Sequence, residues 1–203
     1  KVQGNVGVSG TGGGFKRFST GETDISNASR EIKPQESAIA TENNVEFHEL
    51  LVGLDGLSVV VNKANDWATC MTVEELKLLW NTGSTISNWS EIRPEWPDQK
   101  INLYGPGTDS GTFDFFTHEI NGEAQVSRSD FTMSEDDNVL VIGVSGDKGA
   151  LGYFGYAYYL ENKDEINVVS IDGGDGCVVP NNETIENGEY KPLSRPLYIY
   201  VNK

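Results

Sequence analysis

Cysteine and histidine are scarce in this sequence of 203 residues, which contains two of each. His48 and His118 lie in unrelated contexts, and structural zinc sites use about four ligands drawn largely from these residue types, so we expect no metal site. Cys70 and Cys177 are either two buried thiols, as is usual in cytosolic proteins, or the halves of a disulfide. Their even number and loop-like surroundings favour the disulfide, which implies an oxidising compartment.

Basic residues are also few. The chain has 15 Lys and Arg against 31 Asp and Glu, which gives a formal net charge of −16. Binding to nucleic acid or to an anionic membrane requires clustered basic residues, so this balance argues against both partners. A small anion remains open as a ligand, because neutral amide and hydroxyl donors can hold one at a closed site despite a distant, salt-screened surface charge.

Long apolar runs are absent, since no segment approaches the roughly 18 residues expected of a membrane span. No signal peptide precedes Lys1, and the sequence has no internal repeat or low-complexity tract, so we expect the chain as given to be soluble. With 23 glycines and 37% hydrophobic residues, it is long enough to bury a core and is more typical of a loop-rich α/β protein than of a helical bundle. One large domain or two small ones would fit this length.

Residues 100–120 predict a strand, a turn and a helix in that order. An alternating apolar run at 100–104 is followed by the glycine-containing turn 107–112 and then by apolar residues at helical spacing. The first backbone N–H groups of a helix have no intrahelical partner, so Ser110, Gly111 and Thr112 can hold an anion with hydroxyls and amides together. The alternative is an ordinary N-cap without a ligand.

A second stretch has the same design. Val6 and Val8 form a β-like lead-in, Gly10, Thr11 and Gly12 lie in a glycine-rich turn, and a helix is expected to follow. Two such turns in one chain indicate two lobes that close on one ligand. Neither turn is a Walker A loop, because the Gly-x-x-x-x-Gly-Lys-Ser/Thr motif is absent, and a dinucleotide site is poorly supported.

Three charged residues are candidates to act with these turns. Asp24 can accept a proton still carried by the ligand, as in hydrogen phosphate, and would reject an anion without one; the alternative is a solvated turn residue. Arg30 and Arg128 are each either a bidentate anion ligand or a surface charge.

Several other elements are predicted by local patterns. The clearest helix covers residues 72–80, with Thr72 as its cap and Glu75 as the capping-box partner, and another is expected at 139–144. Strands are predicted at 56–62, 168–172 and 196–201. The glycines between residues 149 and 155 indicate close backbone approach, and residues 172–176 are interpreted as a turn, because a calcium loop would need a closing Glu.

Together, these motifs resemble the PstS family of periplasmic phosphate-binding proteins of the phosphate ABC transporter. The similarity covers essentially the whole chain, and the joint order of the motifs is specific although no single motif is diagnostic. The motifs are Ser9-Gly10-Thr11-Gly12-Gly13-Gly14, Asp24, Ser29-Arg30, Ser110-Gly111-Thr112, Gly149-Ala150-Leu151-Gly152-Tyr153 and Pro192-Leu193-Ser194-Arg195-Pro196-Leu197.

The resemblance implies an α/β periplasmic-binding-protein fold of type II, with two lobes, two crossing strands as a hinge and phosphate in the cleft. By this analogy residues 1–56 are part of lobe 1, residues 57–195 are a hinge strand and lobe 2, and residues 196–203 return to lobe 1. Family members normally have a strand, a phosphate loop and a helix before the stretch that matches Lys1, and helices after the last hinge strand. We therefore expect lobe 1 to be incomplete and to be complemented by another chain or segment.

The resemblance also implies the ligand set. The family's arginine precedes its Ser-Gly-Thr turn, where this chain has Pro106 to Asp109, so the arginine role is assigned to Arg128, with Arg30 as the second choice. The other implied phosphate ligands are Gly10, Thr11, Gly12, Asp24, Ser110, Gly111 and Thr112.

The implied function is capture of inorganic phosphate outside the cytoplasm and its delivery to an ABC permease, without a cofactor. The implied location is periplasmic or extracellular, with or without a membrane anchor. One alternative is an enzyme, a phosphatase or hydrolase that uses Ser110, but the sequence has no Gly-x-Ser-x-Gly elbow and neither histidine has an evident partner. The other alternative is a receptor for a different oxyanion.

Overall fold

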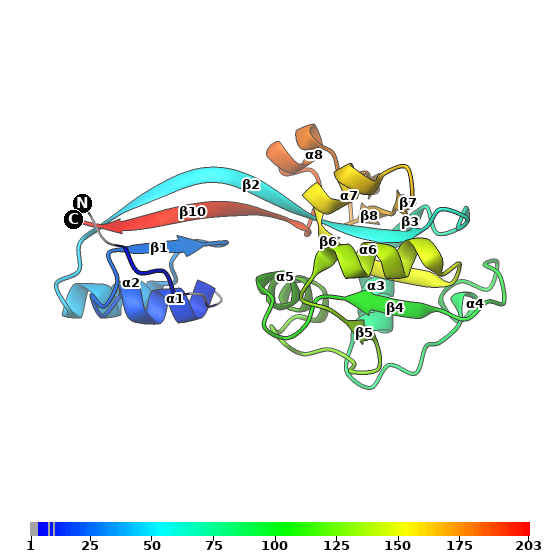
Figure 1. Ribbon diagram of the computed structural model, residues 1–203, viewed down its shortest axis with the longest axis horizontal. Coiled ribbons are helices and arrows are strands. Elements are labelled where there is room, and N and C mark those ends of the chain that lie inside the picture. The colour runs from blue at the N-terminus through cyan, green and yellow to red at the C-terminus, as the bar shows by residue number, and fades with distance from the viewer. Residues whose placement is uncertain (1–3, 8, 10) are drawn as a thin grey trace. The chain divides into compact units, whose positions relative to one another are not determined.

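The computed structural model describes residues 4–7, 9 and 11–203. The chain divides into two compact units, of which unit 1 consists of Lys1–Leu54 and Arg195–Lys203 and unit 2 of Asp55–Ser194. Each unit has its own helices and strands (Figure 1) and its own cluster of buried side chains. Among the described residues, no helix is long and apolar enough to cross a membrane.

The described residues of unit 1 form two helices and three strands. Its elements are α1 (Thr11–Phe18), β1 (Ile25–Ala28), α2 (Pro34–Glu42), the first part of β2 (Phe47–Asn62) and β10 (Ser194–Asn202). β1 pairs antiparallel with β10, which lies next to β2 in the sheet. Both helices lie on the same side of this sheet (Figure 1).

Aromatic side chains form the core of unit 1. Phe15 and Phe18 are fully buried on one face of α1, and the Phe15 ring meets Tyr200 of β10 edge to face at 4.8 Å between centroids. The Tyr200 hydroxyl accepts a hydrogen bond from the Ile32 N–H (2.8 Å) and donates one to Glu49 (2.7 Å). Burial and the bond to Glu49 raise the pKa of Tyr200, so this hydroxyl stays protonated and joins β10 to β2 and to the segment before α2.

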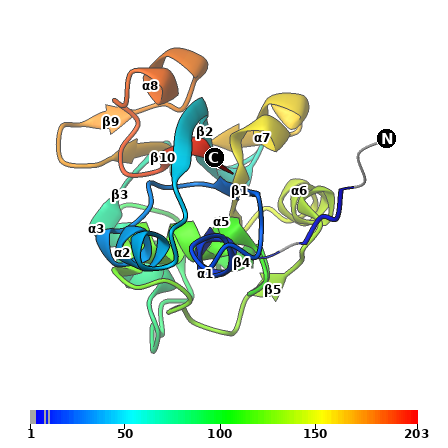
Figure 2. The same ribbon diagram turned by 90° about the vertical axis from the view of Figure 1, so that its left-hand side faces the viewer.

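Unit 2 contains two sheets with helices around them. In the larger sheet the C-terminal half of β2 pairs antiparallel with β6 and β7, and β4 pairs parallel with both β6 and β5. The smaller sheet has the order β3-β8-β9, and α8 lies beside it (Figure 2). The strands are β3 (Cys70–Thr72), β4 (Asn102–Gly105), β5 (Thr132–Met133), β6 (Ala150–Gly155), β7 (Ile166–Val168), β8 (Ser170–Asp172) and β9 (Cys177–Val178). The helices are α3 (Val73–Trp80), α4 (Trp89–Ile92), α5 (Gly111–Phe116), the π-helix η1 (Thr117–Asn121), α6 (Asp137–Gly146), α7 (Tyr156–Asn162) and α8 (Asn182–Glu186).

Trp80, at the end of α3, is at the centre of the main core of unit 2. Its buried ring makes edge-to-face contacts with Phe116, Phe131 and Tyr153 at centroid distances of 4.9 to 5.6 Å. Because Phe116 belongs to α5 and Tyr153 to β6, this one side chain fixes three elements relative to one another.

Most of the predicted elements are present in the structure. The helix at 72–80 is confirmed, with Thr72 accepting from the Glu75 N–H at 3.1 Å and Glu75 accepting from the Thr72 N–H at 2.8 Å. The strand expected at 56–62 is instead the second half of the sixteen-residue β2. The segment around Gly149 and Gly152 is confirmed as a place of close approach, because a Cβ on Gly152 would lie 2.9 Å from the Tyr104 carbonyl oxygen.

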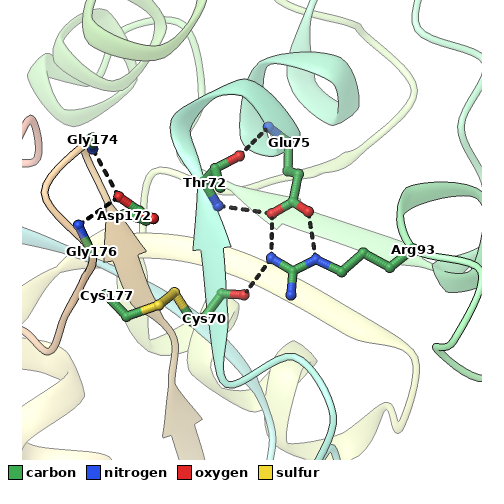
Figure 3. Close-up of a disulfide and its surroundings, with 8 residues drawn as sticks. All are labelled: Cys70, Thr72, Glu75, Arg93, Asp172, Gly174, Gly176 and Cys177. Carbon is green, nitrogen blue, oxygen red and sulfur yellow. Dashed lines mark hydrogen bonds and ion pairs between the residues drawn. A yellow bond between two sulfur atoms is a disulfide. The ribbon is translucent and has the colours of Figure 1, made fainter.

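The predicted disulfide is present between Cys70 of β3 and Cys177 of β9 (Figure 3). It therefore joins the two outer strands of the smaller sheet across a sequence separation of 107 residues. Beside it, Glu75 binds Arg93 through both carboxylate oxygens, and Arg93 donates a further hydrogen bond to the Cys70 carbonyl (3.2 Å). The Arg93 guanidinium also lies over the Trp96 ring at 4.7 Å.

Loss of this disulfide is expected to destabilise unit 2. Replacing both cysteines (Cys70→Ala with Cys177→Ala) should lower the free energy of unfolding by about 4 kcal/mol, because a covalent loop of about 100 residues no longer restricts the unfolded chain. Urea denaturation followed by tryptophan fluorescence measures the change. Reductant should produce a similar loss in the wild type and none in the double variant, and equal midpoints for the two proteins would contradict the prediction.

Candidate functional site

The first candidate site is the beginning of α1 in unit 1. Gly10 lies outside the described residues, and Thr11 is the first residue of the helix. The Thr11 hydroxyl accepts a hydrogen bond from the Ser29 N–H and lies 3.1 Å from the Ser29 hydroxyl, so the first turn of α1 is tied to the end of β1. Gly14 permits this packing, because a Cβ there would lie 2.8 Å from the Ser26 hydroxyl.

Arg30 lies beside this turn. Its Nη2 atom is 3.9 Å from the position that a Cβ on Gly12 would take, and its guanidinium lies over the Phe15 ring at 5.1 Å. Two hydrogen bonds of 2.8 Å join it to both carboxylate oxygens of Glu36, and Nη1 donates to the Glu31 carbonyl (2.9 Å). The structure thus brings Thr11, Gly12 and Arg30 together at the end of α1 where the helix dipole is positive.

Asp24 lies at the other end of β1. It is exposed, and its backbone carbonyl accepts a hydrogen bond from the Asn202 N–H (2.8 Å). An extended strand rises about 3.3 Å per residue, so Asp24 and Ser29 are separated by roughly 16 Å. The structure does not bring Asp24 next to Thr11, and its role as a proton acceptor stays a prediction.

The second candidate site is the beginning of α5 in unit 2. Ser110 is the N-cap, and its hydroxyl accepts a hydrogen bond from the Thr112 N–H (3.1 Å). Gly111 is exposed, and among the described residues outside its own helical turn no atom lies within 4 Å of the position that a Cβ there would take. Ser110, Gly111 and Thr112 therefore lie in one turn whose amides and hydroxyls suit an anion.

The turn before α5 is braced by the segment that follows β5. The Ser110 N–H donates to the Gly107 carbonyl (3.1 Å), and the Glu135 carboxylate accepts from the Asp109 N–H at 3.4 Å. This carboxylate fills the space that a side chain on residue 107 would need. Glycine at 107 therefore allows the acidic side chain to pack directly on the backbone of the turn.

Arg128 makes a different kind of contact. Its Nε and Nη2 atoms bind Asp130 at 2.6 and 2.8 Å, and Nη1 donates to the carbonyls of Leu79 (3.0 Å) and Ile86 (2.8 Å). Its side chain is only 8% exposed. The hydrogen bonds from Arg128 hold the pKa of Asp130 below its ordinary value. These contacts are those of an arginine that fixes the end of α3, so its role as an anion ligand stays a prediction with less support than that of Arg30.

Sequence reasoning assigned no role to two residues of the first site: Ser29, which it noted only in the Ser29-Arg30 motif, and Glu36, which it did not single out. Ser29 is the contact of Thr11, and Glu36 holds Arg30 while also accepting the Lys33 N–H at 2.8 Å. A signal for Glu36 was available, because proline at the first position of a helix with glutamate two residues later is typical of a capped N-terminus.

Comparisons with known proteins agree with this architecture. The family model of the PBP superfamily domain matches residues 1–203. A crystal structure from Planctomyces limnophilus, described as that of a possible phosphate binding protein, has 52% identity and a TM-score of 0.84, covering 95% of this chain and 69% of that one. An ABC-type phosphate transport receptor from Vibrio cholerae, at 23% identity and a TM-score of 0.76, has the same fold.

Curated relatives are similar over almost the whole chain. Protein SphX of Synechocystis is 52% identical over 200 residues, which are 98% of this chain and 60% of SphX. The phosphate-binding protein PstS of Staphylococcus saprophyticus is 38% identical over 198 residues, which are 97% of this chain and 60% of PstS. The chain spans about 60% of the length of these relatives. The predicted α/β periplasmic-binding-protein fold is confirmed, and the chain belongs to the PBP superfamily as a PstS-like member.

Proposed function

We propose that the protein containing this chain captures inorganic phosphate outside the cytoplasm and delivers it to an ABC permease. The main observation behind this proposal is that a PstS-like chain presents neutral hydroxyl and amide donors at the starts of α1 and α5. We further propose that units 1 and 2 correspond to the two lobes predicted from the sequence.

In unit 1 the proposed ligands are the Thr11 hydroxyl, the first amides of α1 and the guanidinium of Arg30. In unit 2 the proposed ligands are Ser110, Gly111 and Thr112, with the Thr112 N–H released by the Ser110 hydroxyl that accepts it in this structure at 3.1 Å. Amides and hydroxyls donate hydrogen bonds to the unprotonated oxygens of a phosphate ligand, and a hydroxyl can also accept a hydrogen bond from an O–H that the ligand still carries. The charge of −16 on the whole chain does not oppose this, because helix N-terminal dipoles act at short range.

Binding without catalysis fits the surroundings of Ser110. The histidine of the same unit, His118, is exposed and lies 2.8 Å from Glu119. Eight residues of helix separate it from Ser110, or about 12 Å at the usual rise, which is too far for a general base. We therefore propose a binding protein and not a hydrolase. The disulfide supports a periplasmic or extracellular location, because disulfides persist in oxidising compartments.

We also propose that further polypeptide covers the first half of β2. Leu50, Leu51, Val52 and Leu54 have between 41% and 60% of their surface exposed. Successive side chains of a strand point to opposite faces, so both faces are apolar and open here. Exposed apolar area of this kind is typical of a surface that another segment buries. The part of the relatives' length that this chain does not span is the occupant we propose.

Phosphate binding should depend on Ser110. Ser110→Ala removes one hydroxyl donor and is expected to weaken phosphate binding about tenfold, which corresponds to the net value of one good hydrogen bond. Isothermal titration of the protein at its natural length measures this, with sulfate as the competing anion. Asn181→Ala is the control, because it removes the cap of α8 in the same unit and should leave affinity unchanged. Absence of phosphate binding by the wild type would contradict the proposed function.

Arg30 and Asp24 should differ in their effects. Arg30→Gln removes a charge-assisted donor beside Thr11 and is expected to weaken phosphate binding by about 10- to 100-fold. Asp24→Asn should change affinity less than twofold, because Asp24 lies at the far end of β1. The same titrations decide this, and a loss of discrimination against sulfate in Asp24→Asn would support the proton-accepting role predicted from the sequence.

The open face of β2 should become buried in the protein at its natural length. Leu51→Lys is expected to destabilise that protein by about 3 kcal/mol, because a buried leucine is lost, but to have little effect on the 203-residue chain. Leu78→Lys is the matched control, since Leu78 of α3 is equally exposed at 60% and should respond alike at both lengths. Denaturant unfolding of each variant and of the unsubstituted protein, at both lengths, gives four differences in the free energy of unfolding. The same effect of Leu51→Lys at both lengths would refute the covering segment.

A further inference from the structure

Arg30 joins the α1 turn to a carboxylate. Nη2 lies beside Gly12 on one side, and on the other it donates to Glu36 Oε1 at 2.8 Å. Nη1 donates to Glu36 Oε2 and to the Glu31 carbonyl. Among the described residues, none accepts a hydrogen bond from the Nε–H of Arg30 or from its second Nη2–H. Arg30 therefore has donors left for an anion, although its charge is already paired.

Glu36 is fixed independently of Arg30. It accepts the Lys33 N–H at 2.8 Å as part of the cap of α2, and its side chain is 19% exposed. Burial acts to raise the pKa of Glu36, but the hydrogen bonds from Arg30 and from the Lys33 N–H outweigh it and hold the pKa below its ordinary value. Glu36 is thus a carboxylate at neutral pH, and the Arg30–Glu36 pair has no net charge.

A neutral pair matters because charge is a poor basis for telling one oxyanion from another. A free guanidinium attracts every anion, whereas a fixed set of hydrogen-bond donors binds tightly only the ligand whose oxygens and protons match it. We propose that Glu36 is a specificity-determining residue, which cancels the charge of Arg30 so that the α1 turn selects its anion by hydrogen bonding. This inference rests on the proposed function.

Unit 2 contains a second arginine–glutamate pair in which the glutamate also caps a helix. Glu75 accepts the Thr72 N–H in the cap of α3 and binds Arg93 through both oxygens (Figure 3). The exposed fractions of the two pairs are nearly equal, 32% and 19% for Arg30 and Glu36 against 31% and 16% for Arg93 and Glu75. Arg93 lies beside Cys70 and Trp96 and not at either candidate turn. Glu75→Gln is therefore a matched control for Glu36→Gln.

The experiment compares these two variants in the protein at its natural length. Glutamine keeps an oxygen that can accept from the Lys33 or Thr72 N–H and removes only the charge. Titration with phosphate and with sulfate, each at low and at high NaCl, gives the affinities. Glu36→Gln is expected to bind sulfate about three- to tenfold more tightly than the wild type, as one uncompensated charge a few ångströms away would cause. Its affinity should also fall more steeply with salt.

The outcomes separate the two proposals. Both variants should lose similar thermal stability, while only Glu36→Gln should gain sulfate affinity; Glu36→Asp, which restores the charge, should reverse that gain. Unchanged or weaker sulfate binding in Glu36→Gln, or an equal gain in Glu75→Gln, would overturn the role of Glu36 while wild-type phosphate binding still supports the proposed function. A wild type that binds no phosphate would overturn both.

Discussion

The backbone N–H groups in the first turn of a helix need acceptors, and the organisation of both candidate turns follows from that constraint. At α5, the Ser110 hydroxyl accepts the Thr112 N–H, and Gly111 is exposed. At α1, Thr11 is turned toward Ser29, and Arg30 stands beside Gly12. Each unit thus presents a short region of positive potential on a strongly acidic chain.

These turns are held in place by aromatic cores. Phe15 of α1 packs on Tyr200 of β10, and Phe116 of α5 stacks on Tyr153 of β6 at 3.7 Å between ring centroids. Because protein interiors are packed as closely as organic crystals, such contacts fix the direction in which a short helix begins. The chemistry of the turns therefore depends on residues that a search for polar motifs does not find.

Local chemistry explains which elements could be predicted from the sequence. The helix at 72–80 was predictable because its cap, its capping-box partner and its apolar period are all within nine residues. The length of β2 was not, because local propensity predicted a strand only from Gly56 to Asn62, whereas pairing with β10 and β6 accompanies a strand that begins at Phe47. Glu36 was missed since its partner, Arg30, is brought to it only by the path of the chain between β1 and α2.

The bond between Cys70 and Cys177 also determines how the protein responds to cleavage. The segment between these cysteines contains α3, β4, α5, β6 and the turn at Ser110, which is most of unit 2. A single cut by a protease anywhere in that segment leaves both products covalently attached. Exposed loops such as the one around Gly83 can therefore be nicked without the release of a fragment, as long as the surroundings remain oxidising.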